Sequence, residues 1–334
     1  MKKILLTGGS SMIGRAICDR LLSVDAIGGI CVSYPKKYSL DLLSADDCRD
    51  ALHYFKPDIV IHAAGFNGGI SFNAKFPADI FHKTALMALN LYNAVGVYAR
   101  DEKKPMMITG ILASCSYPDL ESGYFSEEDL HKGLPNNTVE CHGLAKRIID
   151  DFGRQVSKQY GILVNPVVLT NSYGPFDNFN PYKTKVVGSM IRKFVDAKNN
   201  NLPSITFWGD GSPKREFIYC KDAGRIIADL ACKTYDDVIV NQKTSNLSYS
   251  VTNVGSGQEF TIKETAETIA KIVGYTGEIL WDTSKPNGQM RKALDISRLK
   301  ELMPVNFTPF EQAIKETLDW YLEGDNKAVY DNKI

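Results

Sequence analysis

The chain has 334 residues, of which 44% are hydrophobic and 23% charged, and its 39 basic side chains are offset by 39 acidic ones. This length predicts a large globular protein, and the charge balance gives no reason to expect nucleic acid or an anionic membrane as a partner. No apolar run is long enough for the core of a signal peptide or for a membrane span, and the seven cysteines have neither disulfide nor zinc spacing. We therefore expect a reduced cytoplasmic enzyme without a metal site.

The N-terminal half alternates predicted strands with predicted helices. The strands are continuous apolar runs, which are typical of a parallel sheet covered on both faces. They are predicted at Lys3–Thr7, Asp58–Ala64, Met106–Ala113 and Ile162–Thr170, and long helices are predicted at Ala78–Arg100 and Val139–Gln159. This order predicts an α/β fold with a doubly wound parallel (Rossmann) sheet, whose ligands bind at the carboxyl ends of the strands.

The C-terminal half has a different pattern, in which Gly-, Pro- and Asn-rich loops alternate with helices from about Asn171 onward. Two of these helices are expected to open at capping boxes, Thr261–Glu264 and Thr308–Glu311. We expect a smaller substrate-binding lobe here. Residues 1–170 would form the dinucleotide-binding domain, with 216–246 returning to it, and residues 171–215 and 247–334 would form the lobe.

A glycine-rich loop follows the first strand and opens a helix, as a dinucleotide-binding loop does. Glycine allows the backbone to approach a pyrophosphate, and the free N–H groups of the helix bind its charge. The predicted contacts are Gly8, Ser10, Ser11, Met12, Ile13 and Gly14.

The segment after the second strand bears on the choice of cofactor. NAD-binding proteins usually place an acid there for the ribose hydroxyls, but this chain has no acid before Asp41. Lys36 and Lys37 could instead neutralise a 2′-phosphate, assisted by the hydroxyl of Ser10 or Ser11. The alternative is that both lysines are simply solvated, so the pattern favours NADP(H) without fixing it.

Three further motifs carry a family resemblance. They are Ser114-Cys115-Ser116-Tyr117-Pro118, His142-Gly-Leu-Ala-Lys146 and the long run from Trp208 to Phe217. Together with the glycine loop, they resemble the extended short-chain dehydrogenase/reductases along nearly the whole chain, and within these the GDP-L-fucose synthases most closely. In that family a Tyr-x-x-x-Lys pair handles the proton while the nicotinamide handles the hydride.

The resemblance places the expected catalytic residues and also shows where this chain departs from the pattern. Lys146 matches the family's lysine, His142 replaces the tyrosine, and Cys115 matches the cysteine used for epimerisation. Ala113 occupies the usual Ser/Thr position, so Ser114 or Ser116 would have to provide that hydroxyl. Lys185 occupies the position of the second epimerisation acid/base, which is a histidine in the family.

These departures bear differently on reduction and on epimerisation. Reduction of a 4-ketone needs one proton for the developing alkoxide, and histidine, with a reference pKa near 6.5, can donate it as imidazolium. A packing substitution in an inactive homologue is the alternative reading of His142. Epimerisation needs an acid and a base on opposite faces of a carbon, and lysine at position 185 makes this less favoured than reduction. Cys115 remains open between a catalytic and an inert role.

The resemblance also implies contacts with the ligands. For the cofactor these are Asp41 beside the adenine, the loop residues Ala63 and Ala64, Lys146 at the ribose and Asn171 near the nicotinamide amide. For the sugar nucleotide they are Asn178, Lys193 (with Arg192 as a neighbouring candidate), Trp208, Arg215 at the diphosphate and Lys285 near the nucleotide. His62 is expected to be a buried, hydrogen-bonded residue rather than a proton carrier.

These expectations converge on an NADPH-dependent C4 keto-reductase of a nucleotide-activated, GDP-linked 4-keto sugar in surface polysaccharide biosynthesis. A 4-keto-heptose or a 4-keto-6-deoxyhexose is the expected substrate. Two alternatives remain: a bifunctional 3,5-epimerase/4-reductase, and a catalytically silent protein that binds a nucleotide sugar or NADP(H). The resemblance further implies a homodimer in which Ala78–Arg100 and Val139–Gln159 form a four-helix interface.

Overall fold

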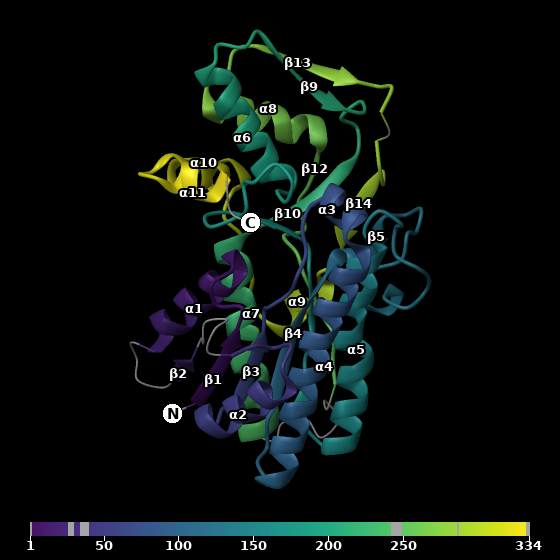
Figure 1. Cartoon of the computed structure of the whole chain (residues 1–334), viewed down its shortest axis with the longest axis vertical. Helices are drawn as coiled ribbons and strands as arrows, with labels where there is room; N and C mark the ends of the chain where they lie inside the picture. The colour runs from purple at the N-terminus through teal and green to yellow at the C-terminus, as the bar shows by residue number, and fades with distance from the viewer. Residues whose placement is uncertain (1, 26–29, 34–39, 242–248, 286, 332–334) are drawn as a thin grey trace.

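The computed structural model describes residues 2–25, 30–33, 40–241, 249–285 and 287–331 (Figure 1). Its main sheet has seven strands, all parallel, in the order β11-β7-β4-β3-β1-β2, with β6 also paired to β4. The strands are β1 (Lys2–Thr7), β2 (Ile30–Ser33), β3 (Ile59–His62), β4 (Met107–Ala113), β6 (Leu163–Val164), β7 (Val167–Leu169) and β11 (Thr252–Val254). The predicted doubly wound parallel sheet is confirmed.

The predicted strand Ile162–Thr170 is divided into two. Pro166 separates β6 from β7, because proline has no N–H to donate to a neighbouring strand. β6 pairs with the start of β4, at Met107 and Ile108, and β7 pairs with its end. Both pieces therefore still lie beside β4.

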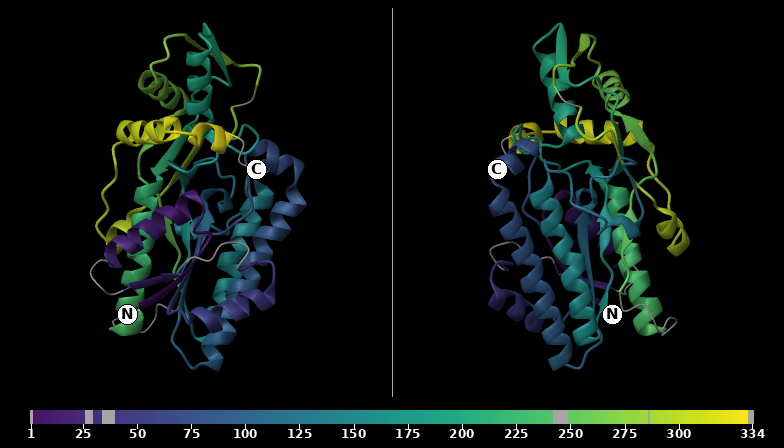
Figure 2. Two further views of the ribbon diagram at one scale, coloured as in Figure 1. Left: turned by 60° about the vertical axis from the view of Figure 1, so that its left-hand side comes forward. Right: turned by 90° about the vertical axis from the view of Figure 1, so that its right-hand side faces the viewer.

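Helices cover both faces of this sheet (Figure 2). On one face, α1 packs against α7; on the other, α2 packs against α4, and α4 against α5. Their bounds are α1 (Met12–Asp25), α2 (Ala45–Phe55), α4 (Pro77–Asp101), α5 (Glu140–Tyr160) and α7 (Cys220–Tyr235). The buried strands Ile4–Leu6 and Ile59–Ile61 lie between the two layers, which explains why these strands are apolar along their whole length.

The remaining elements form a second, smaller body at the carboxyl ends of the main strands (Figure 1). Its second sheet has the order β12-β10-β14-β5, with β8 paired to β10, and β9 and β13 form a two-stranded ribbon. The strands are β5 (Tyr124–Phe125), β8 (Asn171–Tyr173), β9 (Ser204–Trp208), β10 (Lys214–Tyr219), β12 (Glu259–Thr261), β13 (Glu278–Asp282) and β14 (Arg291–Leu294). The helices are α3 (Ile70–Lys75), α6 (Val186–Asn199), α8 (Ile262–Val273), α10 (Phe310–Leu322) and α11 (Asn326–Asp331). Helix α9 (Ser297–Leu302) instead packs on β11, and its Leu299 is part of the core of the main sheet.

An aromatic-rich core of its own holds this second body together. It is built mainly from α6, α8 and α10, with Phe194, Phe207 and Phe310 among its buried side chains. The division of the chain into two domains has an exception at β11. Residues 252–254 lie in the main sheet, although the sequence pattern assigned the range 247–334 to the lobe.

The two predicted capping boxes have different outcomes. At α8 the box is confirmed: the Thr261 hydroxyl accepts from the Glu264 N–H, and the Glu264 carboxylate accepts from the Thr261 N–H. The box at Thr308 is wrong, because α10 begins at Phe310 with Pro309 as its N-cap. The Thr308 N–H instead donates to the Asp222 carboxylate at 2.7 Å, which holds the chain away from the helix. Across the described ranges, no helix combines the length and apolar character that a membrane span requires.

Candidate active site

The order of the main strands reverses between β1 and β3, and this is the place where a doubly wound sheet binds its ligand. The glycine loop follows β1 at this point. Gly8 has a φ of +75°, and a Cβ on it would lie 2.6 Å from the Ala64 nitrogen. A Cβ on Gly14 would lie 2.0 Å from the Gly8 carbonyl oxygen, so neither position tolerates a side chain. This close-packed turn at the N-terminus of α1 fits the pyrophosphate of a dinucleotide.

Ser11 completes the turn. Its hydroxyl donates to the Gly8 carbonyl at 2.8 Å and accepts from the Gly14 N–H at 3.1 Å. That hydroxyl is therefore engaged within the loop, and Ser10, which is exposed, is the one available to a phosphate. Lys36 and Lys37 lie outside the described residues. Asp41 accepts from the Leu43 N–H in the turn that precedes α2.

The end of β3 lies beside this loop and holds His62 in its interior. The ring is 1% exposed, and its Nδ1 lies 2.8 Å from the Thr7 hydroxyl. Burial, followed by the charge of Lys146, lowers the pKa of His62 to about 3. The expectation that His62 is a buried hydrogen-bonded residue is confirmed. The adjacent Ala63 and Ala64 form the other wall of the glycine turn.

A short turn of 3₁₀ helix, η1 (Ser114–Ser116), follows β4 and carries Cys115. Helix α5 packs closely on it. A Cβ on Gly143 would lie 2.3 Å from the Cys115 carbonyl oxygen, and Arg147, one turn later, donates from Nε to the Ser116 carbonyl at 2.6 Å. Both serines of this turn are buried, and the Ser116 hydroxyl has no hydrogen-bond partner among the described residues.

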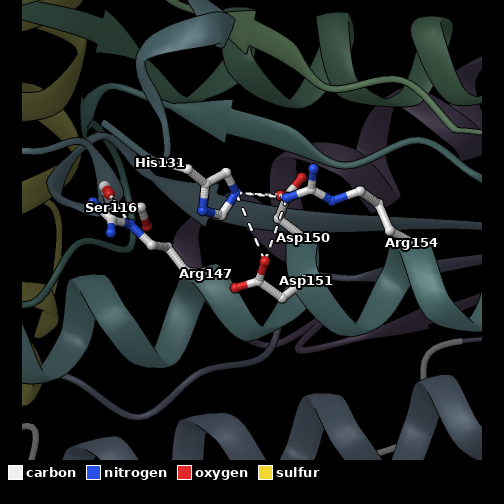
Figure 3. Close-up of polar contacts among 6 residues, drawn as sticks. All are labelled: Ser116, His131, Arg147, Asp150, Asp151 and Arg154. Atoms are coloured by element: carbon white, nitrogen blue, oxygen red, sulfur yellow. Dashed lines mark hydrogen bonds and ion pairs between the residues drawn. The ribbon is translucent and has the colours of Figure 1, made fainter. Parts of the chain in front are cut away.

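Arg147 belongs to a row of charged side chains along α5 (Figure 3). Asp150 is buried, and its Oδ2 lies 2.6 Å from His131 Nε2 and also contacts the Arg154 guanidinium. Asp151, which is exposed, lies 3.3 Å from the same guanidinium nitrogen. His131, Asp150 and Asp151 are side chains of types that bind metals, but here Arg154 supplies the positive charge between them. The group is therefore an ion-pair network that supports the face of α5 behind η1.

His142 lies on the first turn of α5 and is 5% exposed. Its Nε2 lies 2.9 Å from the side-chain nitrogen of Asn67, and its Nδ1 is buried without a partner among the described residues. Burial lowers the pKa of His142 well below its ordinary value, and three lysines, Lys146, Lys185 and Lys292, lower it further. The free ring is therefore neutral near pH 7, which corrects the expectation of an imidazolium donor in the unliganded site.

Lys146 lies one turn beyond His142 and reaches the ends of two strands. Its ammonium donates to the Ile111 carbonyl at 2.8 Å and to the Ala64 carbonyl at 3.4 Å. Burial lowers the pKa of Lys146 to about 8. The ammonium thus lies between the loop after β3 and β4, next to the turn expected to bind the cofactor.

Three more cations lie nearby on the second body: Lys185 and Lys292 interact electrostatically with His142, and Arg215 interacts with Lys292. Lys185 is the N-cap of α6, and Arg215 and Lys292 lie side by side on β10 and β14. Burial lowers the pKa of both Arg215 and Lys292, and Lys292 interacts electrostatically with Cys115, Arg215 and Lys185. Lys292 was missed in the sequence, where Lys285 was chosen instead. The parallel pairing that places Lys292 beside Arg215 is a tertiary feature without a local signal.

The expected nucleotide contacts lie farther along the second body. Trp208 ends β9 and is 72% exposed, and the exposed Lys285 lies in the turn after β13, the strand that pairs with β9. The Lys193 ammonium lies 5.0 Å from the centre of the Phe207 ring. The remaining two residues are held by local contacts: Asn171 donates to the Glu216 carbonyl, and the Asn178 carboxamide accepts from the Asn180 N–H.

The structure therefore brings Cys115, His142, Lys146, Lys185 and Arg215 into one charged group where the main sheet meets the second body. Trp208, Lys193 and Lys285 lie on the elements that extend away from it. Lys36 and Lys37, which were also expected at the cofactor, lie outside the described residues.

Comparison with known proteins identifies the family of this chain. The model of the NAD dependent epimerase/dehydratase family matches residues 4–242, and the chain belongs to this family. It is 32% identical over 329 residues to the GDP-L-fucose synthase of Escherichia coli (strain K12), with 98% of each chain covered. It is also 32% identical over 330 residues to the GDP-L-colitose synthase of Yersinia pseudotuberculosis, covering 97% of this chain and 99% of that one.

Solved structures give the same result. A GDP-L-fucose synthetase from Naegleria fowleri bound to NADP has 28% sequence identity and a TM-score of 0.81, with 96% of this chain and 93% of that chain covered. A GDP-mannoheptose C4 reductase from Campylobacter jejuni with NADP bound has 23% identity and a TM-score of 0.78, covering 96% and 98%, and this second likeness concerns the fold alone. The resemblance to the GDP-L-fucose synthases is confirmed.

Proposed function

We propose that the protein is an NADPH-dependent oxidoreductase that reduces the C4 ketone of a GDP-linked sugar. The observation that carries this proposal is the group formed by His142, Lys146, Lys185, Lys292 and Arg215, where a buried ring and a buried ammonium face further cations. The relatives named for GDP sugars and the neighbour bound to NADP support both the substrate class and the cofactor. The glycine turn at Gly8 and Gly14 accommodates the pyrophosphate of that cofactor.

The residues divide the work of such a reduction. NADPH supplies the hydride when it is bound. Lys146 binds the nicotinamide ribose and holds a positive charge beside the reacting carbonyl, where it stabilises the developing alkoxide. His142 donates a hydrogen bond, and then the proton, to the oxygen at C4. Arg215 binds the diphosphate, because its planar guanidinium matches phosphate oxygens, and Lys292 beside it adds a second charge.

Epimerisation is a second candidate activity because Cys115 is present. Its partner position holds Lys185 in place of the family's histidine, a residue type that can both donate and accept a proton near neutral pH. We therefore assign reduction without epimerisation, on a 4-keto-heptose or 4-keto-6-deoxyhexose of a surface polysaccharide pathway. Solvent deuterium appearing at C3 or C5 of the product would contradict this assignment and support the bifunctional alternative.

The experiment is to follow NADPH absorbance with a panel of 4-keto nucleotide sugars, in parallel with NADH. We expect NADPH consumption with a GDP-linked 4-keto sugar, and a loss of turnover in His142→Phe with its NADPH affinity unchanged. Full activity in this variant would remove His142 from the mechanism. If the panel gives no NADPH consumption while GDP and NADPH still bind, the chain is a silent nucleotide-binding protein.

We also propose that the protein is a homodimer through α4 and α5. Both helices have half-buried apolar side chains outside the buried core: Leu86, Leu89 and Val97 on α4, and Leu144 and Ile148 on α5. Pairing these faces with a second copy removes this surface from water. Sedimentation of a monomer at micromolar concentration would contradict the proposal.

A further inference from the structure

The two nitrogens of the His142 ring have different surroundings. Nε2 lies 2.9 Å from Asn67 Nδ2, and an amide nitrogen has only hydrogens to offer. Nε2 must therefore accept, and in a neutral ring the hydrogen is then on Nδ1. Nδ1 is buried and has no partner among the described residues. A buried donor without a partner is rare in folded proteins, and at a reaction centre it calls for a functional explanation.

We propose that Asn67 is a positioning residue that fixes the tautomer of His142, so that a neutral ring presents its Nδ1–H to the sugar oxygen at C4. This inference rests on the proposed reductase function and deepens it. It identifies the hydrogen-bond donor of the site as a neutral imidazole, and it assigns a role to a residue that the sequence motifs do not contain.

The loop that carries Asn67 is held in place by its neighbours. The Thr84 hydroxyl on α4 donates to the Phe66 carbonyl at 2.9 Å and accepts from the Phe66 N–H at 3.3 Å. On the other side, a Cβ on Gly65 would lie 3.3 Å from the Lys146 ammonium. The two residues that precede Asn67 are therefore held in place, which restricts the positions that its side chain can take beside the His142 ring.

The charges that face the ring favour its neutral form. Lys146 lies on the same helix, Lys185 lies at the start of α6, and Lys292 lies on β14, and all three disfavour an imidazolium. A neutral imidazole can still polarise a carbonyl through its N–H. These ammonium groups also stabilise the negative charge that develops on the sugar oxygen or on the ring as the proton moves.

The step balances as follows. With NADPH bound, the nicotinamide would supply the hydride: its C–H bond would break as the new C–H bond forms at C4 of the sugar, and the electron pair of the carbonyl π bond would pass to the oxygen. The Nδ1–H bond of His142 would break as the O–H bond of the product alcohol forms, which leaves the ring as an imidazolate beside the three ammonium groups. The ring would then regain a proton from the bulk solution, so that each turnover consumes one NADPH and one solvent proton and releases NADP⁺.

The first test is spectroscopic and requires no turnover. In protein labelled with ¹⁵N-histidine, the His142 signal, identified by its loss in His142→Phe, reports which nitrogen carries the hydrogen. We expect the hydrogen on Nδ1, with no titration between about pH 6 and 8. A hydrogen on Nε2, or a midpoint near the reference value of about 6.5, would overturn the inference. If no 4-keto sugar is reduced, the proposed function fails, but the nitrogen signals still decide the tautomer.

The second test uses Asn67→Asp, which preserves the shape but replaces the donor with an acceptor. The carboxylate accepts a hydrogen from Nε2, so the neutral ring has a bare Nδ1 and only the charged ring can donate there. We expect the kcat of the variant relative to wild type to fall at least about tenfold between pH 6 and 8.5, with the NADPH affinity nearly unchanged. A ratio that does not vary with pH would refute the role of Asn67. Asn90→Asp is the matched control, because Asn90 also donates from its amide, to the Leu42 carbonyl, far from the ring in the fold.

Discussion

The buried His62 provides a test of the fold that does not depend on substrate. Its ring is 1% exposed, burial lowers its pKa to about 3, and its hydrogen-bond partner is Thr7. In the unfolded chain the same ring has a pKa of about 6.5. Between these two values the unfolded state binds more protons than the folded state, so stability falls as the pH is lowered through this range.

The size of the effect follows from the two pKa values. A pH of about 4.5 is two units below the pKa of His62 in the unfolded chain, and each unit is worth about 1.4 kcal/mol. At this pH the titration of His62 therefore lowers the free energy of unfolding by about 3 kcal/mol. At pH 7 this contribution is absent. In His62→Asn the substituted amide keeps a polar atom near Thr7 and cannot titrate, so the variant has only the pH-independent loss from the smaller side chain, on the order of 1–2 kcal/mol.

The assay is denaturant unfolding of wild type and His62→Asn at pH 7 and at about pH 4.5. We expect the variant to have the lower free energy of unfolding at pH 7. At about pH 4.5 the free energy of unfolding of wild type should have decreased by about 3 kcal/mol more than that of the variant. Comparing the pair cancels the contributions of carboxylates such as Glu216, which both proteins share. A difference that stays constant across the two pH values would refute the burial of a neutral ring at this position.

Three further predictions concern the proposed active site. In wild type, kcat/KM should fall as the pH rises through about 8, because Lys146 loses its proton there. In Lys146→Met this decrease should be absent, and a fluorescence titration should show weaker binding of NADPH. Arg215→Met should raise the KM for the sugar nucleotide by about 10- to 100-fold and weaken inhibition by GDP, with NADPH affinity unchanged, and an unaltered KM would contradict a diphosphate contact. Arg147→Met removes the hydrogen-bond donor of the Ser116 carbonyl and a positive charge near Asp150. We therefore expect the free energy of unfolding, measured with denaturant, to fall by about 1–3 kcal/mol, and kcat to be lower. Unchanged stability and kcat together would show that Arg147 does not support the turn at Cys115.

Much of the fold could be predicted from the sequence because its signals are local. The strands Lys3–Thr7 and Met106–Ala113 are short and mainly apolar, and the predicted helix Val139–Gln159 differs by a single residue at each end from α5. Two predictions of secondary structure were wrong, and each has a physical cause. Pro166 interrupts a strand that hydrophobicity alone predicted as continuous, and Thr308, in spite of a correct capping pattern, is held by a carboxylate 86 residues away in the chain.

The active site was predictable only where its residues belong to motifs. His142, Lys146, Cys115 and Arg215 lie in such motifs, and the structure brings them together. Lys292 was missed because its place depends on the pairing of two strands, and Asn67 because its role is a contact between a loop and a helix 75 residues later. The spacing of four residues already places Lys146 near His142 and disfavours a charged ring there, but the burial of the ring and the approach of Lys185 and Lys292 are tertiary features.

The same cations have opposite effects on a tyrosine and on a histidine at position 142. A phenol is neutral when protonated, so neighbouring ammonium groups favour its loss of a proton and make it a stronger acid. An imidazole is charged when protonated, so the same groups keep it neutral and remove its stronger acidic form. A histidine in this environment therefore cannot act simply as a shorter tyrosine. It must use the N–H of a neutral ring, and a neutral ring is useful only if a neighbour fixes which nitrogen carries the hydrogen. The contact with Asn67 meets that requirement, and for this reason the substitution at position 142 and the amide at position 67 should be regarded as one functional unit.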